Sequence, residues 1–331
     1  MTPRLSVVVP VRNGAESLGR CLASIARAAA VAGGGVEVIV ADNGSVDGSP
    51  RVARDHHARV ISVPGVRVSV VRNRAARTSD APIVAFVDAD HEVGPGWVKA
   101  ALAALADPGV VAAGSDYLPP PRPTWVQQTY DALRAHAPGR RDVEWLPSGN
   151  LAIRRAALLR TGGFDETLET CEDVDLCRRL TALGRIVSDD RMASVHHGDP
   201  ATLGAVFLGE LWRGRDNVRV SLRAPRSTRS LLTAVQPVAT VAGAAALLTA
   251  AVARPSLAPR VLPALAGFVL LASAPRVVLM WRRAGGVGWT RRLQCAALAL
   301  TFDLGRAAAL VVRAGHRVRR GELARRRLAR S

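Results

Sequence analysis

The sequence has few cysteines, the residues that form disulfides and zinc sites in small domains. Four cysteines occur among 331 residues, and Cys171 and Cys177 lack the spacing of a zinc site. We therefore expect free thiols in a reducing compartment rather than a disulfide framework. Internal repeats are also missing, and the apolar run that follows Arg4 is too short for the core of a secretory signal, so we expect no signal peptide.

Acidic residues and lysine are scarce in the C-terminal third of the chain. From Arg223 onward there are 19 arginines, no lysine and two acids, so this third carries +17 of the net charge of +18. A basic region of this kind suits an anionic partner, either a nucleic acid or a lipid surface. Because the arginines follow long apolar runs, we expect anionic membrane lipids as the partner and no nucleic acid.

The same third contains long runs without charge. Residues 231–253 are 23 uncharged residues, enough to cross ~30 Å of hydrocarbon. Residues 261–281 form a second candidate span, interrupted by Arg276, whose side chain is near enough to the end to snorkel to the interface. A third run at 291–313 has one basic face and one Ala/Leu face, which is typical of a helix lying in the interface, although a third span also fits.

The first 222 residues alternate short apolar runs with helical segments. Strands are predicted at 5–11, 36–41, 60–63 and 83–87, and helices at 16–32 and 69–78. Continuous apolar runs of this length are typical of parallel strands that are buried on both faces. The pattern predicts an α/β domain over residues 1–222, followed by an arginine-rich membrane region over residues 223–331.

Carboxylates follow two of the predicted strands. Asp42 ends the second, and Asp88-Ala89-Asp90 follows the strand at 83–87. Open α/β sheets bind ligands at the carboxyl ends of their strands, and a carboxylate pair there suits Mg²⁺ or Mn²⁺ shared with a diphosphate. An Asp-x-Asp triplet alone is weak evidence, and Asp42 fits equally well an Asx turn with the Asn-Gly pair that follows it.

A second group of acids lies at Glu172-Asp173. Thr170 precedes them, so a helix N-terminus with Thr170 as its cap would explain both carboxylates without any catalytic role. The alternative is that one of them accepts a proton during catalysis. The pair His196-His197 is likewise either a polar strand end or part of a site.

Seven pieces of the chain, in order over residues 5–197, resemble the family 2 glycosyltransferases. They are Ser6–Asn13, Asp42–Ser45 with Asp47-Gly48, Arg72-Asn73, Asp88–Asp90, Ser148–Asn150, Gly162–Glu166, and Cys171–Leu176 with Arg178–Leu180. The resemblance implies the GT-A fold of nucleotide-diphospho-sugar transferases, a mostly parallel twisted sheet flanked by helices. It also implies inverting sugar transfer with a divalent metal on the diphosphate.

The resemblance assigns five residues to the donor. Pro10 and Asn13 in the first loop would edge the nucleotide, and Asp42 would bind the base. Asp88 would bind the ribose, or the metal through water. Arg72 would lie near the nucleotide and the sugar.

The resemblance also implies a metal site and a base. Asp90 would be the direct ligand of Mn²⁺ or Mg²⁺, and His196 or its neighbour His197 would complete the site. Asp173, beside Glu172, would deprotonate the acceptor hydroxyl as it attacks the anomeric carbon. The cation would stabilise the charge of the departing diphosphate.

Other functions fit parts of this pattern. A polyprenyl-phosphate sugar transferase would share the fold, the cation and paired C-terminal spans, but would not need a base at Asp173. A processive synthase is disfavoured because no Gln-x-x-Arg-Trp element occurs. A non-catalytic membrane protein that binds nucleotide sugars or anionic surfaces is the alternative from another class.

The membrane region and the donor together predict a location. Nucleotide sugars are cytosolic, so residues 1–222 should face the cytoplasm, at the cytoplasmic membrane. Two spans plus an interfacial helix keep the last eight arginines, from Arg313 to Arg330, on that side, as the positive-inside rule favours. The acceptor is then expected to be a lipid-linked or cell-envelope glycan. The polar stretch 125–144 is interpreted as an irregular, mobile acceptor loop.

Overall fold

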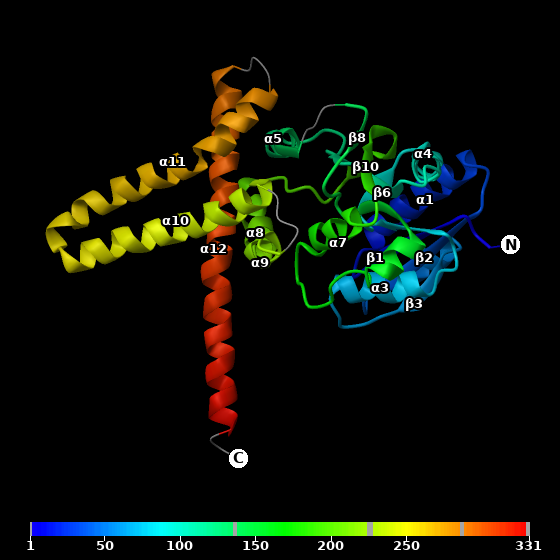
Figure 1. The fold of residues 1–331 in the computed structure, drawn as a ribbon, viewed down its shortest axis with the longest axis horizontal. Coiled ribbons are helices and arrows are strands. Elements are labelled where there is room, and N and C mark those ends of the chain that lie inside the picture. The colour runs from blue at the N-terminus through cyan, green and yellow to red at the C-terminus, as the bar shows by residue number, and fades with distance from the viewer. Residues whose placement is uncertain (1, 135–137, 224–227, 285–287, 329–331) are drawn as a thin grey trace. The chain divides into compact units, whose positions relative to one another are not determined.

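The structure is a computed structural model that describes residues 2–134, 138–223, 228–284 and 288–328 (Figure 1). The chain forms two compact units. The first contains residues 1–122 and 134–199, and the second contains residues 123–133 and 200–331. These divisions differ from the change of composition at residue 223, so the extent of the catalytic domain stays a prediction.

An eight-stranded sheet with the order β3-β2-β1-β4-β9-β6-β10-β8 forms the centre of the first unit. Its strands are β1 (Leu5–Val11), β2 (Val36–Asp42), β3 (Arg59–Ser62), β4 (Ile83–Val87), β6 (Val110–Gly114), β8 (Arg140–Asp142), β9 (Asn150–Arg154) and β10 (Arg185–Asp189). β9 runs antiparallel to β4 and β6, and β8 runs antiparallel to β10, while the other neighbours are parallel. The mixed α/β architecture predicted from the alternating pattern is confirmed.

Helices cover both faces of this sheet. They are α1 (Ala15–Val31), α2 (Ser49–Asp55), α3 (Val68–Arg77), α4 (Trp97–Ala104), α6 (Arg155–Arg160) and α7 (Glu172–Thr181), with a short 3₁₀ turn at Asp190–Met192. Successive side chains of β1 enter different cores, because side chains alternate along a strand. Val7 packs in the cluster that includes α1 and α4, and Val8 packs in the cluster that includes α3 and α7. The central strand β4 is therefore apolar at every position, and β1 is apolar at every position except Ser6.

A second, three-stranded sheet joins segments that are distant in the sequence. β5 (His91–Val93), β11 (Ser194–His196) and β7 (Tyr117–Leu118) have the order β5-β11-β7. β11 pairs antiparallel with β5, and in that register His196 lies opposite His91. This pairing brings the end of the first unit back to the residues that follow Asp90.

The segment after the proline-rich stretch is helical, so its interpretation as an irregular loop is wrong. α5 (Trp125–Arg134) buries Val126 and Tyr130, which are four residues apart and so share one face of the helix. Short β8 follows at Arg140–Asp142, and residues 135–137 lie outside the described part of the chain. Polar residues between these apolar positions concealed the helical period.

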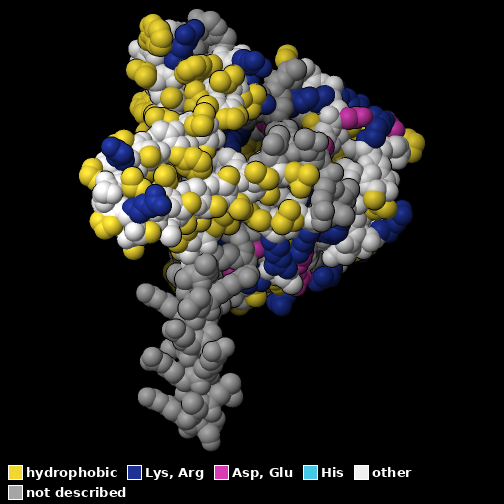
Figure 2. Space-filling model, turned by 60° about the vertical axis from the view of Figure 1, so that its left-hand side comes forward, with side chains coloured by type: hydrophobic (Ala, Val, Ile, Leu, Met, Phe, Trp, Pro, Cys, Tyr) yellow, Lys and Arg dark blue, Asp and Glu magenta, His cyan; other side chains and the backbone are white. Residues whose placement is uncertain are grey.

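The second unit is helical. After α5 it contains α8 (Leu203–Arg213), α9 (Asn217–Ser221), α10 (Thr228–Ala253), a 3₁₀ turn at Pro255–Leu257, α11 (Ala258–Ala284) and α12 (Trp289–Leu328). Among the residues that the structure describes, three segments are long and apolar enough to cross a membrane, namely Thr233–Ala253, Pro255–Arg283 and Trp289–Val312. Hydrophobic side chains are exposed along α10 and α11 (Figure 2). The helices therefore fit membrane association, and the number of spans stays a prediction.

Arg276 has a partner in this unit that the sequence did not indicate. Its guanidinium Nε donates to Asp303 Oδ1 of α12 at 2.8 Å, and its guanidinium carbon lies 4.2 Å from the centre of the Phe302 ring. The expectation that this side chain snorkels away from the second span is therefore replaced by an internal ion pair. The basic end beyond residue 312 lies outside the described side chains.

Candidate active site

Arg72 joins two of the predicted motifs. This arginine of α3 is buried, with 3% of its surface exposed. One guanidinium nitrogen donates to Asp88 Oδ1 at 2.7 Å, and another donates to Glu172 Oε1 at 2.7 Å. Asp88 follows β4 and Glu172 begins α7, so the arginine holds two motifs that are 84 residues apart at one edge of the sheet.

The start of α7 has an unusual backbone. Cys171, rather than Thr170, is the residue before the helix, and it adopts a left-handed conformation with φ of 59° and no side-chain capping bond. Such a conformation is uncommon for a residue with a side chain and is often found at functional sites. The Asp173 carboxylate accepts hydrogen bonds from the backbone N–H groups of Val174 at 2.8 Å and Ser148 at 3.4 Å.

Burial makes this carboxyl pair more basic than exposed acids. Loss of hydration raises the pKa of Asp173. Loss of hydration and the charge of Asp173 raise the pKa of Glu172 to about 7, although the Arg72 guanidinium opposes the shift. A carboxylate with a raised pKa is a better proton acceptor near neutral pH, as general base catalysis requires.

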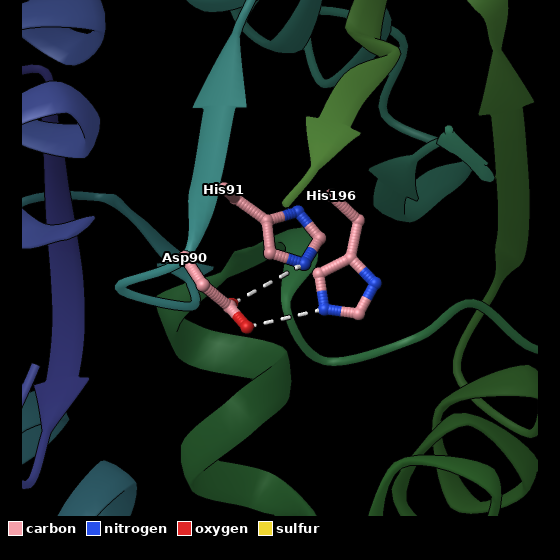
Figure 3. Close-up of side chains that lie close together, drawn as sticks. All are labelled: Asp90, His91 and His196. Atoms are coloured by element: carbon pink, nitrogen blue, oxygen red, sulfur yellow. Dashed lines mark hydrogen bonds and ion pairs between the residues drawn. The ribbon is translucent and has the colours of Figure 1, made fainter. Parts of the chain in front are cut away.

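Asp90, His91 and His196 form a second cluster (Figure 3). One ligand atom from each residue lies within 4.8 Å of the others. His196 Nε2 is 3.3 Å from Asp90 Oδ2, and His91 Nε2 is 4.0 Å from Asp90 Oδ1. The two imidazoles are brought together by the β5–β11 pairing and stack with their ring centres 4.5 Å apart.

Both imidazoles are oriented by bonds to their other nitrogens. His196 Nδ1 lies 2.7 Å from the buried carboxylate of Asp199, which is ion-paired with Arg134. His91 Nδ1 lies 2.9 Å from Ser194 Oγ. Each Nε2 is therefore the nitrogen nearest to Asp90. A histidine fixed in this way through its second nitrogen is typical of metal sites.

The two histidines have opposite electrostatic surroundings. Burial opposes the charge of His196, but hydrogen bonds to Asp199 and Asp90 outweigh it and raise the pKa to about 9. Burial, together with the charge of His196, lowers the pKa of His91 to about 4. His91 is thus neutral at physiological pH, and in the tautomer that donates from Nδ1 to Ser194 its Nε2 can accept a ligand.

The cluster fits a divalent cation. His91 Nε2 is buried and has no hydrogen-bond partner among the described residues. A Cβ added at Gly198 would overlap the Asp90 carboxylate and approach His196 Nε2, so only glycine leaves this side of the cluster open. Carboxylate and neutral imidazole ligands together suit Mn²⁺ and related ions, and His196, whose pKa is raised to about 9, would give up its proton when such an ion binds. Asp88 is not in the cluster, and its predicted role at the metal or the ribose stays a prediction.

Sequence reasoning missed His91 and Tyr117. His91 follows Asp90 directly, and that adjacency was the available signal. The Tyr117 ring of β7 packs 4.4 Å from the His91 ring and 5.1 Å from the His196 ring. A Cβ added at Gly149 would contact both the Asp88 carboxylate and the Tyr117 hydroxyl, so the hydroxyl lies near Asp88 while the ring lies against the two histidines.

The structure distinguishes the two adjacent histidines. His197 is directed to different partners, with Nε2 3.2 Å from Glu92 Oε2 and Nδ1 3.0 Å from an Arg20 guanidinium nitrogen. Only His196 of the pair belongs to the cluster with Asp90.

The predicted nucleotide side is a pair of joined loops. Asn13, in a left-handed conformation with φ of 53°, accepts from the Val46 N–H at 2.8 Å, and its own N–H donates to Ser45 Oγ at 2.9 Å. The buried Asp42 carboxylate accepts from the Ser45 N–H at 3.3 Å, the turn contact expected of an Asx residue. Pro10 lies inside β1, so placing it in the first loop is wrong.

The chain is similar to known glycosyltransferases. The sequence profile described as Glycosyl transferase family 2 matches residues 6–166. The N-acetylglucosaminyl-diphospho-decaprenol L-rhamnosyltransferase of Mycobacterium tuberculosis is 31% identical over 70% of this chain and 93% of that protein. The pre-mycofactocin glycosyltransferase of the same organism is 28% identical over 69% of this chain. The chain spans about half the length of that second relative, 50% of which is covered.

A solved structure has the same fold. It is the mannosyltransferase PcManGT from Pyrobaculum calidifontis in complex with GDP-Man and Mn²⁺. The TM-score is 0.64 at 21% identity, with 95% of this chain and 87% of that chain covered. The order of the strands and the acids that follow β4 agree with the GT-A fold. The sequence similarities show that the chain belongs to glycosyl transferase family 2, and the structural similarity shows that it has a GT-A fold.

Proposed function

We propose that this protein transfers a sugar from a nucleotide-diphospho-sugar to a hydroxyl acceptor, with inversion and with a divalent metal. The observation that carries the proposal is the bridge from Asp88 through Arg72 to Glu172. It joins the acids after β4 to a carboxyl pair with raised pKa at the start of α7. A donor site and a proton acceptor thus share one edge of the sheet.

The metal site consists of Asp90, His91 and His196. A bound Mn²⁺ or Mg²⁺ supplies positive charge that stabilises the leaving diphosphate. Asp199 and Ser194 hold the imidazoles in the orientation that presents Nε2. These bonds fix the ligands before the donor arrives and so lower the cost of ordering the site.

Asp173 is the proposed base. It takes the proton from the acceptor hydroxyl while the hydroxyl oxygen forms its bond to the anomeric carbon. The bond from that carbon to the diphosphate oxygen breaks on the opposite face, so the configuration inverts and a nucleoside diphosphate leaves. Burial raises the proton affinity of Asp173 and the Arg72 guanidinium lowers it, while the charge of Asp173 raises the proton affinity of Glu172.

The donor is bound by the loops after β1 and β2. Asn13 and Asp42 define the edge proposed for the nucleotide, and Pro10 borders it from the strand. Asp88 is proposed to bind the ribose while the hydrogen bond from Arg72 holds its carboxylate in place. The buried Asp42 carboxylate has acceptor capacity for a base N–H in addition to its turn contact.

The acceptor is proposed to be a lipid-linked or cell-envelope glycan at the cytoplasmic membrane, with the catalytic unit on the cytoplasmic side. Three apolar helices in the second unit support membrane association. The name of the rhamnosyltransferase relative specifies a decaprenol-linked acceptor for that protein. The arginine-rich third of the chain favours anionic lipids around the helices.

The test is transfer by the purified full chain with Mn²⁺ and a panel of nucleotide sugars and membrane lipid extracts. We expect activity that EDTA removes, and a loss of about 10²- to 10³-fold in Asp90→Asn. Glu92→Gln, which alters the neighbouring His197 contact, serves as the matched control and should retain activity. Full activity of the Asp90 variant in EDTA would contradict metal-dependent transfer. Transfer to a polyprenyl phosphate instead of a hydroxyl would identify the alternative acceptor.

A further inference from the structure

Residues 289–312 of α12 have one exposed apolar face and, opposite it, one buried face. Leu293, Leu304 and Val311 are exposed, with 67%, 40% and 58% of their surfaces accessible. Eighteen residues separate the first from the last, which is five helical turns or about 27 Å, and Leu304 falls on the same line. The exposed face is therefore a straight apolar stripe.

The opposite face of α12 is buried in part against helices that are too short to cross a membrane. Cys295 and Leu298 share a core with Val126 and Tyr130 of α5, Val206 of α8 and Met280 at the end of α11. α5 has 10 residues and α8 has 11, so each is only about 15 to 17 Å long. The part of α12 with the composition of a span thus packs against the short helices α5 and α8 as well as against α11.

The contact between α8 and α12 is close and charged. A Cβ added at Gly305 would lie 2.8 Å from the Phe207 carbonyl oxygen, so the two helix backbones touch there. Glu210 of α8 is fully buried and accepts from Arg306 Nε of α12 at 2.6 Å. It also accepts from the Tyr130 hydroxyl at 3.1 Å. The contact thus includes a buried ion pair as well as apolar side chains.

These contacts argue against a membrane crossing by α12. If residues 289–312 spanned the bilayer, α5 and α8 would have to enter the hydrocarbon with them. The ends of such short helices leave backbone N–H and C=O groups without partners, which hydrocarbon does not tolerate. At the membrane surface the same helices would face water while the apolar stripe faces lipid.

The junction of α11 with α12 carries residues typical of the membrane interface. Arg292 lies 5.9 Å from the Trp281 ring centre and 5.4 Å from the Trp289 ring centre, and Trp281 Nε1 donates to the Arg292 carbonyl at 3.1 Å. Tryptophan and arginine are enriched at that depth. Within the second unit, α12 also runs across the α10–α11 hairpin rather than alongside it (Figure 1).

We propose that α10 and α11 cross the membrane as a hairpin, and that residues 289–312 lie along the lipid surface on the side of the catalytic unit. The stripe of Leu293, Leu304 and Val311 enters the acyl boundary. The partner of this stripe is the bilayer itself. The chain beyond residue 312 then stays on the same side as its N-terminus.

Depth measurements on the full chain test this arrangement. Leu293→Cys, Leu304→Cys and Val311→Cys are spin-labelled in liposomes of phosphatidylethanolamine and phosphatidylglycerol, and accessibility to oxygen and to a nickel chelate gives the depth. We expect one shallow depth at all three sites. Leu271→Cys in α11 is the deep control, and the unmodified chain, whose four cysteines are free, gives the labelling background.

A graded profile with position 304 much deeper than positions 293 and 311 would overturn the proposal, as would labels that never contact lipid. Retained sugar transfer shows which labelled proteins are folded. Independently, protease access to N- and C-terminal tags in sealed vesicles should be the same from either side. Opposite access of the two tags would show a third crossing.

Discussion

Two glutamates, one in each unit, are both buried beside arginine, yet their pKa values are shifted in opposite directions. Glu172 contacts Arg72, yet its pKa is raised to about 7 by burial and by the charge of Asp173. Glu210 is also buried, but Arg306 and Arg213 outweigh burial and hold its pKa below the usual range. The comparison shows that the balance of neighbouring charge, and not burial alone, separates a carboxyl group suited to proton transfer from one that joins helices.

The largest effect is expected at the base beside Glu172. Asp173→Asn should lower kcat by about 10²- to 10⁴-fold, because the amide cannot accept the acceptor proton. Donor binding, measured by calorimetry with Mn²⁺, should be nearly unchanged. Asp175→Asn is the matched control on the same helix, since Asp175 pairs with Arg179 at 2.8 Å. Equal kcat in the Asp173 variant and the wild type would assign the base elsewhere.

The second unit should respond through stability instead of chemistry. Glu210→Ala leaves Arg306 and Arg213 without their shared buried partner and should destabilise the fold by about 3–5 kcal/mol. Thermal unfolding in detergent measures this loss. Because the pKa of Glu210 is lowered on folding, its stabilisation is present above the pKa of the unfolded group and is lost as the pH falls through the folded value.

The same variant distinguishes the two glutamates. Transfer per folded molecule should be unchanged in Glu210→Ala at a temperature where it remains folded. A large loss of kcat with unchanged unfolding temperature would contradict the assignment of Glu210 to helix packing.

A smaller effect on transfer is expected from Asp199, which contacts the proposed metal ligand His196. Asp199→Asn weakens the hold on His196 Nδ1 and should lower Mn²⁺ affinity by about 10- to 100-fold. Excess Mn²⁺ should restore most of kcat, because Asp199 does not touch the substrates in the proposed mechanism. A loss of kcat that no concentration of Mn²⁺ restores would show that Asp199 does more than orient the histidine.

The pH dependence of transfer gives the finest test of the Glu172–Asp173 pair. The base must be deprotonated, so kcat/KM should fall as the pH drops through the raised pKa of the Glu172–Asp173 pair, up to tenfold per pH unit. Glu172→Gln removes one charge of the pair and should move this acidic limb to lower pH. A limb that stays in place would separate Glu172 from the titration of the base.

Much of the first unit was predictable because its signals are local. The strand at 5–11 and the strand at 83–87 match β1 and β4, and the predicted helices match α1 and α3 to within one residue. Apolar runs bounded by turn residues record burial directly in the sequence. α5 was missed because Val126 and Tyr130 are separated by polar residues, and only packing in the second unit makes them a buried face.

The parts of the site were predictable as motifs but not as contacts. Asp90 and His196 were expected to act together, whereas His91 was not, because its position depends on the pairing of β5 with β11 across a hundred residues. The same is true of the bridge from Arg72 to Glu172. The identity of two adjacent residues does not reveal which side of a strand each side chain will occupy or which partner it will contact.

The sequence by itself determined the family, the alternating strands and helices, and the separation of a near-neutral domain from an arginine-rich apolar third. Composition and periodicity are properties of short segments, so they can be read along the chain. Only the tertiary structure decided which histidine faces Asp90, which carboxyl groups share Arg72, and which face of α12 remains exposed. Those choices come from long-range strand pairing and helix packing, where burial and charge neutralisation select one arrangement among many that the same segments allow.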